Sequence, residues 1–584
     1  MSWRIIAENR RLLAQEQGAV IKDWGGKIPV ALAFAHHYWL GMSNLGFQSI
    51  YGLFNSYSDV VCERFFVPEA SLLREYNRTK TPLLSLETQR PLYEFELIAF
   101  SLSHENDYPG VVKILKLGGL PWRAEHRSRR QGLVLAGGVT MRSNPEPLAE
   151  FIDLALIGDG EVIVPKFLQA WREVRFQSLP KTELLLHLAR QVPGAYAPAL
   201  YEAAFNDQGR LVSFHPRRSE VPPRVKVARA ETLPRPALST QILTSETEFS
   251  GTRLVEIGRG CTRGCRFCLA GFTYRPPRTA PLESVLSALP APASDRDRVG
   301  LISPAVADHP QLETLVRALS DQGREVTVSS LRVEALSPGL VEALRLGRQK
   351  SAAIAPEAGS QRLRDFINKG LTEEQILEGA GLLAQAGVRN LKLYFMLGLP
   401  SETDRDAQAV AVLTEKIRGR LKKAAGGRKS LPRITLSLSS FSPKPFTPFQ
   451  IEPMADLKVL GTRAQMIKDA LRGQKGVSVQ FDPPRWTYLQ TLFSRGHRRL
   501  STLIETLADS GGSLSRARKS LSFDPDPLVW GSREENAVLP WSFLDHGFKD
   551  DYLENELARA RNHRLTPPCP PEACRLCGVC SDQD

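Results

Sequence analysis

Three closely spaced cysteines follow a short apolar segment near the middle of the chain. Cys261, Cys265 and Cys268 lie in the stretch LVEIGRGCTRGCRFCLAGF, with the spacing C-x3-C-x2-C. Thiolates on one short loop can each bind one iron of a 4Fe-4S cluster. A cluster that only carries electrons takes four cysteines, so three would leave one iron open to another molecule. An open metal position of this kind is where metal centres do chemistry.

A zinc site is the main alternative for these cysteines. Zinc knuckles normally join a C-x2-C pair to a second pair of ligands at short range. After Cys268, the first cysteine or histidine is His309, which is too distant for that pattern. The spacing therefore favours an iron–sulfur cluster over zinc, or over a chance group of buried cysteines.

The composition is that of a large globular protein. The chain has 584 residues, of which 42% are hydrophobic and 24% are charged, and this length predicts two to four domains. The N-terminal stretch MSWRIIAENRRLLAQEQ is polar and has no apolar signal core. We find no apolar run near the length of a membrane span. The eight cysteines fall mostly into two groups, which favours metal ligation over disulfides and a cytoplasmic location.

The net charge of +13 attracts nucleic acid and anionic surfaces in general. Here the positive charge is spread along the chain, and the basic runs are short, at 127–130, 416–433 and 495–499. Such runs are usually solvated faces or loops. Nucleic acid is thus an open substrate class that the charge does not favour.

Residues 1–190 alternate between strand-like and helix-like segments. Strands are expected at 28–34, 97–103, 132–138 and 154–161. Strands that end in small residues and lead into helices predict a parallel, doubly wound sheet of the Rossmann type. Ligands of such sheets bind outside the carboxyl ends of the strands, where small residues let them approach the backbone. The small residues at these ends are Ser101, Ser103, Gly137, Gly138, Gly158 and Gly160.

The remainder of the chain divides into three further segments. Residues 191–245 are proline-rich and polar, and they predict a connector with some β structure, including a hairpin at FNDQGRLVSF. Residues 246–470 contain six strand–helix units, which predict a full or partial (β/α)6 barrel of the TIM type. The cysteine loop follows the first of these strands, at the end of the barrel where active sites lie. Residues 471–584 predict a small α-rich region with a cysteine tail.

Several further blocks resemble one subfamily of the radical S-adenosylmethionine (SAM) superfamily. The blocks are GMSNLG, SLETQRPL, NPEPLAEFIDLALIGDGE, APEAGSQRLRDFINKG, LKLYFMLGLPSETDRD, SFSPKPFTPFQ, LFSRGHRRL and CRLCGVC. Together with the three-cysteine motif, they extend the resemblance over most of the chain. Members of this subfamily carry an N-terminal domain of the cobalamin-binding type before a radical SAM barrel.

The resemblance implies which residues bind SAM. In the superfamily the open iron takes the amino and carboxylate groups of SAM, and Phe267 occupies a position that usually holds an aromatic. By the same likeness, Glu357 and Gly398 lie near SAM, and Ser329, Ser330 and Arg332 contact its ribose or carboxylate. The alternative for each is a structural role at the barrel mouth. Gly398 is expected to allow a close backbone approach rather than to act chemically.

The resemblance also implies a cobalamin site, with Ser101, Ser103, Gly137 and Gly138 as candidate contacts. The familiar D-x-H-x-x-G signature, which supplies a histidine to cobalt, is replaced here by GMSNLG at 41–46. Either cobalamin binds without a histidine ligand, or the domain has kept the fold and lost the cofactor. The second barrel strand ends in Ile302-Ser303-Pro304 and lacks the Gly-Gly-Glu that many radical SAM enzymes use.

Four more cysteines lie close together in the tail, and one lies alone. The spacing of Cys569, Cys574, Cys577 and Cys580 is C-x4-C-x2-C-x2-C, which predicts a second iron–sulfur cluster or a zinc site. The alternative is a free, reduced tail. Cys62 is expected to be a small buried hydrophobe.

Three functions remain open from the sequence. The first is a radical SAM enzyme associated with cobalamin and resembling a methyltransferase, supplied with electrons by a donor of the flavodoxin or ferredoxin type. The second is an RNA-modifying enzyme of the methylthiotransferase type. Those enzymes carry three cluster cysteines in an N-terminal domain, where this chain has only Cys62. The third is an iron–sulfur or corrinoid-binding protein without catalytic activity. No membrane partner is expected, and the sequence does not name the substrate.

Overall fold

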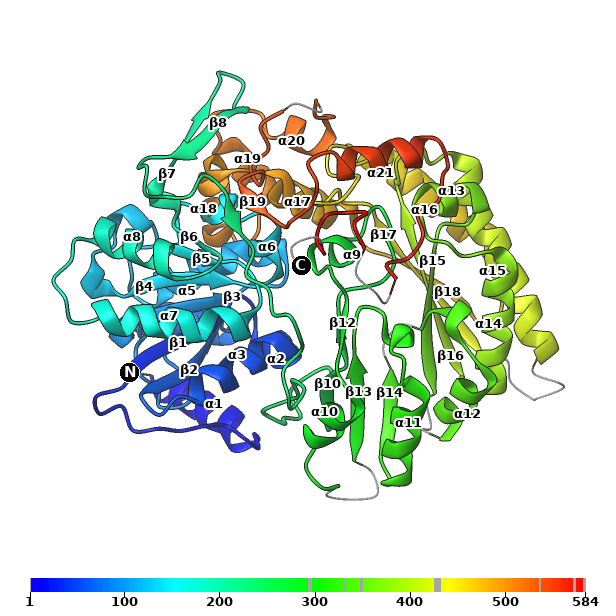
Figure 1. The fold of residues 1–584 in the computed structure, drawn as a ribbon, viewed down its shortest axis with the longest axis horizontal. Coiled ribbons are helices and arrows are strands. Elements are labelled where there is room, and N and C mark those ends of the chain that lie inside the picture. Colours follow the sequence, from blue (N-terminus) through cyan, green and yellow to red (C-terminus); the bar gives the residue numbers. More distant parts are fainter. Residues whose placement is uncertain are drawn as a thin grey trace.

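The computed structural model describes residues 2–292, 297–328, 331–346, 350–424, 432–534, 537–570 and 574–580. An N-terminal α/β unit and a second α/β unit lie side by side, and the C-terminal segments cross over both (Figure 1). Within the described ranges, no helix combines the length and apolar character that a membrane crossing requires.

The N-terminal unit is built on a sheet with the strand order β2-β1-β3-β4-β5-β6. The first five strands are parallel, and β6 is antiparallel to β5. Their bounds are Ile28–Phe34 (β1), Val60–Phe66 (β2), Leu97–Ser101 (β3), Leu133–Gly137 (β4), Leu154–Leu156 (β5) and Ala195–Tyr196 (β6). Every residue of β1 is buried, as expected for a strand covered by helices on both faces. The predicted doubly wound sheet is confirmed.

Helices cover both faces of this sheet. On one face α3 (Leu45–Asn55) packs against α7 (Gly160–Val174). The chain crosses from β1 to β2 in one direction along the sheet and from β3 to β4 in the other. Because such connections are right-handed, α3 and α5 (Tyr108–Leu117) lie on opposite faces. The strand order reverses between β1 and β3, and ligands of doubly wound sheets bind at such a reversal.

The second unit contains seven parallel strands in two hydrogen-bonded groups. Their bounds are Thr252–Glu256 (β10), Arg298–Ile302 (β13), Glu325–Val328 (β14), Ser351–Glu357 (β15), Asn390–Leu397 (β16), Arg433–Ser440 (β17) and Val477–Phe481 (β18). A backbone hydrogen bond of 2.9 Å from Leu331 to Ala353 joins the two groups. The six strands expected from the sequence all form, and β18 is a seventh that was not predicted. Among the described residues no pairing joins β10 to β18, so the barrel is partial.

The helices of this unit follow the strands in the chain, as the sequence predicts. The longer ones are α11 (Leu312–Asp321), α12 (Pro338–Leu346), α14 (Glu373–Gln385), α15 (Asp404–Ala424) and α16 (Leu457–Ala470), and the short ones are α10 (Leu282–Ser287) and α13 (Gln361–Phe366). Thr372 caps α14 through a hydrogen bond from the Gln375 backbone, and the Gln375 side chain completes a capping box. Residues along β16 and β17 alternate between buried and more accessible positions, so one face of each strand packs in the core.

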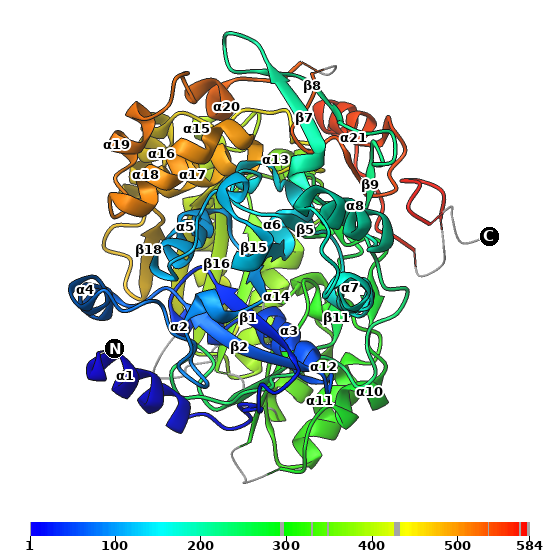
Figure 2. The ribbon, with the colours of Figure 1, turned by 90° about the vertical axis from the view of Figure 1, so that its left-hand side faces the viewer.

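The connector and the C-terminal segments join the two units. The predicted hairpin forms from β7 (Tyr201–Phe205) and β8 (Leu211–Pro216), and β9 (Val225–Lys226) pairs with β19 (Leu544–Asp545). Helices α17 (Pro484–Arg495) and α18 (Ser501–Asp509) lie against the N-terminal unit (Figure 2).

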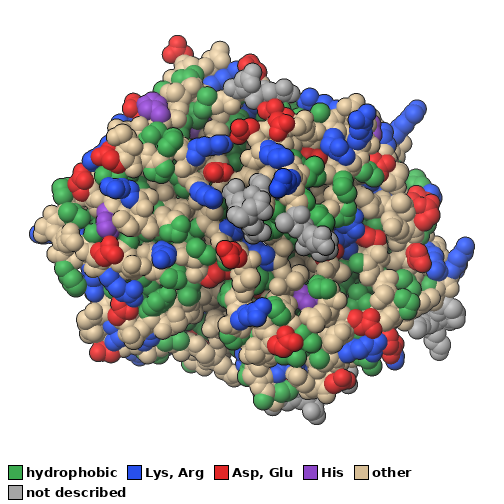
Figure 3. Space-filling view, in the orientation of Figure 1, with side chains coloured by type: hydrophobic (Ala, Val, Ile, Leu, Met, Phe, Trp, Pro, Cys, Tyr) green, Lys and Arg blue, Asp and Glu red, His purple; other side chains and the backbone are tan. Residues whose placement is uncertain are grey.

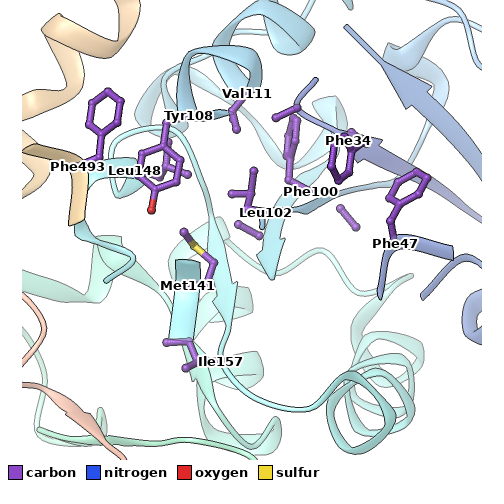
Figure 4. Packing of buried hydrophobic residues seen from close by; sticks show 14 of the residues in the cluster. Phe34, Phe47, Phe100, Leu102, Tyr108, Val111, Met141, Leu148, Ile157 and Phe493 are labelled. Atoms are coloured by element: carbon purple, nitrogen blue, oxygen red, sulfur yellow. The ribbon is translucent and has the colours of Figure 1, made fainter. Parts of the chain in front are cut away.

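Both apolar and ionic contacts hold α17 in place. Phe493 packs against Tyr108 of α5 with ring centroids 5.3 Å apart (Figure 4). Next to this pair, Glu105 accepts hydrogen bonds from Lys444 at 2.5 Å and from Ser494 at 2.7 Å. Although burial alone would raise the pKa of Glu105, Lys444 lowers it to about 2. This buried ion pair is one of the contacts that join the N-terminal unit to the barrel.

Candidate metal and cofactor site

The three-cysteine loop runs from β11 (Gly258–Arg259) to α9 (Leu269–Thr273), which begins directly after Cys268. Gly260 has a left-handed φ of 84°, and a Cβ there would come within 2.6 Å of the Tyr274 carbonyl oxygen. Only glycine therefore fits at this turn. Within the loop, the backbone N–H of Cys268 donates to the Cys265 carbonyl at 2.9 Å.

The three thiols share one half-buried neighbourhood. Burial raises the pKa of Cys261, Cys265 and Cys268, that of Cys268 to about 11, and the cysteines also raise each other's pKa. The metal-free thiols are therefore protonated at neutral pH. Because only thiolates bind iron or zinc, metal binding here would release protons.

One ion pair adjoins the thiols. Lys369 Nζ lies 3.2 Å from Glu357 Oε1, and the side chains are 18% and 15% exposed. The positive charge of Lys369 acts on both Cys265 and Cys268 and lowers the pKa of each, against the larger effect of burial. Glu357 ends β15 with a left-handed φ of 66°, an unusual conformation for a residue other than glycine. Glu357 was predicted from the sequence and Lys369 was not, although Lys369 lies in the FINKG end of the APEAGSQRLRDFINKG block.

A second group of ion pairs fixes the other side of the loop. Arg332 pairs with Asp308 and, at 2.6 Å, with Glu334. Asp308 also accepts a short hydrogen bond from Thr262, the residue after Cys261. The single positive charge of the Arg332 guanidinium thus faces two carboxylates, and through Asp308 this arginine connects the segment after β14 to the cysteine loop. Ser329 and Ser330, the neighbouring residues predicted to contact SAM, lie outside the described residues.

Two other predicted SAM residues have clear structural surroundings. Gly398 follows β16 with a φ of 80°, and a Cβ there would meet Leu460 at 2.7 Å and Ala455 at 2.9 Å. Its N–H donates to Glu402 at 2.6 Å. Phe267 is partly buried against an apolar cluster that includes Phe366 and Phe449. Their contacts with SAM remain predictions.

The tail cysteines lie next to the three-cysteine loop. The backbone N–H of Cys569 donates to the Thr262 carbonyl at 2.7 Å. Cys577 is buried and the other three tail cysteines are half-buried. Burial raises the pKa of Cys569, and the remaining three tail thiols raise it further against the opposing charge of Arg275. The four tail sulfurs thus share one neighbourhood.

In neither cysteine group do the sulfurs converge on a single ion. Among the described residues, no three or more His, Cys, Asp and Glu side chains surround one ion position. A 4Fe-4S cluster attaches each thiolate to a different iron, so its ligands do not meet at one point. The thiol chemistry and the grouping of each set are therefore compatible with clusters.

A cavity of about 670 Å³ connects the N-terminal sheet to the barrel mouth. Ser101, Gly137 and Gly138 line it at the ends of β3 and β4, whereas Ser103 is exposed and does not line it. On the barrel side the cavity reaches Gly260, the residue before Cys261. Its walls are mainly apolar side chains from the sheet, α3 and α7. A volume of this size suits an organic cofactor or substrate.

An interdomain ion cluster forms one polar wall of the cavity. Asp159, which precedes α7, pairs with Arg142 at 2.8 Å, with Arg278 at 2.7 Å and with Arg259 at 3.2 Å. These guanidinium groups hold the pKa of Asp159 well below its usual range, although burial alone would raise it. Tyr274 lies under the Arg142 guanidinium at 4.3 Å and also lines the cavity. This cluster fixes the barrel mouth against the N-terminal sheet.

Two family models match this chain. The model described as "Radical SAM proteins, N-terminal" matches residues 46–198, and the model described as "Radical SAM superfamily" matches residues 255–413. The chain belongs to the radical SAM superfamily. The second match runs from β10 into α15 and includes the three-cysteine loop. Membership implies a 4Fe-4S cluster, SAM and a source of single electrons.

Individual relatives were found in sequence and in structure. An uncharacterized protein of Methanocaldococcus jannaschii is 28% identical over 460 residues, covering 78% of this chain and 90% of its own. The radical SAM methyltransferase TsrM of Kitasatospora setae has a TM-score of 0.46 at 14% identity, over 73% of this chain and 76% of TsrM. The cobalamin-dependent radical SAM enzyme OxsB has a TM-score of 0.40 at 12% identity, over 94% of this chain and 64% of OxsB.

Proposed function

We propose that this radical SAM protein is an enzyme that cleaves SAM reductively at a 4Fe-4S cluster held by Cys261, Cys265 and Cys268. The observation that carries the proposal is the meeting of three thiols on one loop at the carboxyl ends of parallel strands. A cluster bound there supplies one electron to SAM, which divides into methionine and a 5′-deoxyadenosyl radical that takes hydrogen from an unactivated carbon. The substrate carbon would enter through the cavity that reaches Gly260.

The residues around the loop have separate tasks in this proposal. Lys369 puts a positive charge beside Cys265 and Cys268, which favours the more negative, reduced state of a bound cluster. Glu357 holds the Lys369 ammonium in place at 3.2 Å. Asp308 connects Arg332 to Thr262 and so holds the loop in position. Gly398 lets the chain turn with a left-handed φ at the end of β16, where a Cβ would meet Leu460 and Ala455.

We further propose that the cavity receives cobalamin and that the reaction is a methyl transfer. The sheet order places the cavity at the carboxyl ends of β3 and β4, where doubly wound sheets bind ligands. A Cβ on Gly137 would meet only the Leu156 carbonyl oxygen, at 3.6 Å, so larger side chains there would extend into the cavity. Bound cobalamin would supply the methyl group.

A cobalamin bound in this cavity would not receive a histidine from its lining. In the described part of the chain the lining contains no histidine, which agrees with the replacement of D-x-H-x-x-G by GMSNLG. The methylthiotransferase-type alternative has less support, because Cys62 is fully buried in β2 and has no cysteine partners there.

Anaerobic purification with iron and cobalamin present tests both proposals. Absorption spectra and the cobalt, iron and zinc contents are measured, and the reduced protein is then incubated with SAM. We expect bound corrinoid, iron, and release of 5′-deoxyadenosine. Iron with 5′-deoxyadenosine but no cobalt would contradict the cobalamin proposal alone, and absence of 5′-deoxyadenosine from iron-loaded, reduced protein would contradict both.

A further inference from the structure

The C-terminal segment is bound to the three-cysteine loop at several points. Asn368 donates to the Gly264 carbonyl at 3.1 Å and accepts from the Thr566 backbone at 2.9 Å. Arg266, in the middle of the loop, donates to the Arg564 carbonyl at 2.5 Å. These polar contacts are buried or half-buried and join residues between 104 and 298 positions apart. The tail is therefore part of the site.

Apolar contacts complete the attachment of the tail. Cys577 and Val579 are buried in a cluster with Phe272 of α9 and Tyr552 of α21 (Tyr552–Arg561). The Cys577 carbonyl also accepts a hydrogen bond of 2.9 Å from the Lys549 backbone. Because Phe272 lies four residues after Cys268, this cluster connects the tail cysteines to the helix that starts at the loop.

A buried guanidinium group lies between the two sets of cysteines. Arg275 donates to the Tyr552 hydroxyl at 2.6 Å and lies 4.6 Å from the centre of the Phe272 ring. Burial alone would lower the pKa of Arg275, but Tyr552, Cys569 and Cys577 raise it. A cation in this position stabilises thiolates in the tail and any negatively charged centre that they bind.

The spacing of the tail favours iron–sulfur ligation over zinc. Cys574, Cys577 and Cys580 follow one another as C-x2-C-x2-C, which is the run found in bacterial ferredoxins. Zinc sites instead combine one C-x2-C pair with a second pair farther along the chain. Cys569 provides the fourth thiol, so a cluster in the tail would have all four irons ligated and would transfer electrons without binding SAM.

We propose that Cys569, Cys574, Cys577 and Cys580 bind a second 4Fe-4S cluster that passes electrons to the cluster of the three-cysteine loop. An external one-electron donor of the flavodoxin or ferredoxin type reduces the second cluster. The second cluster then loses that electron to the first, and no bond is made or broken in either transfer. The relay role rests on the proposed function, whereas binding of the second cluster does not.

The surface around the tail suits an acidic donor. On the face shown in Figure 3, Lys and Arg side chains gather near the centre of the view, where Figure 1 draws the last described segment of the chain in red. Exposed Arg564 and Arg575 border the tail cysteines in the chain. Complementary charge of this kind accelerates the encounter with an acidic protein.

Iron analysis of three variants of the full chain tests the cluster. The loop variant carries Cys261→Ala, Cys265→Ala and Cys268→Ala; the tail variant carries Cys574→Ala and Cys577→Ala; Cys62→Ala is the control. After anaerobic reconstitution we expect about eight irons per chain in the unaltered protein and the control, and about four in each of the other two. The reduced loop variant should give an electron paramagnetic resonance spectrum that SAM does not change.

Zinc in place of iron, or no metal at all, in a folded loop variant would overturn the second cluster. Circular dichroism shows whether each variant folds. If the tail variant does not fold, the metal content of the folded loop variant still tests the second cluster. The two proposals can be separated by comparing the variants. If SAM does not change the spectrum of the loop cluster in the tail variant, while the loop variant keeps its iron, the proposed function is wrong and the second cluster is supported.

The relay is tested by the rate at which the loop cluster is reduced. We expect reduced flavodoxin to reduce the loop cluster about tenfold more slowly in the tail variant, because the tail cluster that would accept its electron is absent. Dithionite, a small reductant that reaches the loop directly, should reduce it at the same rate in both proteins. Equal rates with flavodoxin would refute the relay.

Discussion

The wall around the cysteine loop and the wall that the N-terminal sheet gives to the cavity are very different. On the barrel side, charged pairs such as Lys369–Glu357 and Arg332–Asp308 surround the cysteine loop. On the sheet side, the strand ends carry Gly137 and Gly138 beside apolar side chains. The first wall is suited to a charged redox centre, and the second to a bulky organic group. Changes to each wall should therefore affect different measurements.

Loss of one loop thiol should have the largest effect. We expect Cys265→Ala to abolish formation of 5′-deoxyadenosine from SAM, because the cluster would lose one of its three protein ligands. Product is measured by chromatography after anaerobic reduction. Cys62→Ala, which removes a thiol buried in β2, should retain activity. Continued SAM cleavage by the Cys265 variant would show that this loop does not bind the cluster that cleaves SAM.

A bulky side chain at Gly137 should affect cobalamin binding without affecting SAM cleavage. We expect Gly137→Leu to weaken cobalamin binding about tenfold or more, since the side chain would occupy space that lines the cavity. Cleavage of SAM should change little. Ser103→Leu is the control, because Ser103 is exposed and does not line the cavity. Titration followed by absorption measures the affinity, and equal affinities would place cobalamin elsewhere.

Removal of the Lys369 charge should produce a moderate effect on the barrel side. We expect Lys369→Met to lower the midpoint potential of the loop cluster by about tens of millivolts, because a nearby cation favours the reduced state. Cleavage of SAM should slow severalfold as a result. Lys369→Arg keeps the charge and should restore most of the potential. A potential that is the same in all three proteins would show that Lys369 has only a structural role.

The smallest expected effect concerns Asp107, near the N-terminal sheet. Burial, with a smaller contribution from Glu105, raises the pKa of Asp107 to about 7. The folded state therefore favours the protonated acid, and this stabilisation is present below about pH 4 and is lost as the pH rises through about 7. Asp107→Asn cannot ionise at this position, so we expect the variant not to lose this stabilisation as the pH rises.

Denaturant unfolding at a series of pH values measures that difference. The free energy of unfolding of the variant, relative to the unaltered protein, should increase between about pH 4 and about pH 8. The rise of the Asp107 pKa to about 7 sets an upper value of about 4 kcal/mol, and the partial exposure of Asp107 reduces it toward about 1 kcal/mol. A difference that does not vary with pH would mean that Asp107 ionises normally in the folded protein.

Short-range patterns in the sequence predicted much of the fold. Apolar strand segments followed by helices indicated both α/β units. The capping box of α14 is equally local, because it joins Thr372 to Gln375, three positions later. The short strand β18 was not predicted, although it extends the sheet beside β17. Its residues are half-buried or exposed, so they lack the apolar run that marks a central strand.

Contacts between distant segments could not be predicted in the same way. Ser101 and Ser103 looked equivalent as candidate cofactor contacts, yet β3 ends at Ser101 and only that residue lines the cavity. The alternation of faces along a strand no longer applies to Ser103, because the chain has left the sheet. Lys369 was missed because its proximity to Cys265 depends on how β15 and the following helix lie against the loop.

The sequence alone determined which thiols are candidate ligands, since a C-x3-C-x2-C spacing places three of them on one loop whatever the rest of the chain does. It also determined the parallel strand–helix architecture, which depends on local patterns. Only the tertiary structure decided that the tail docks at Thr262 and that the cavity spans both units. These contacts form because burial of apolar and paired charged groups brings together segments that no local pattern relates.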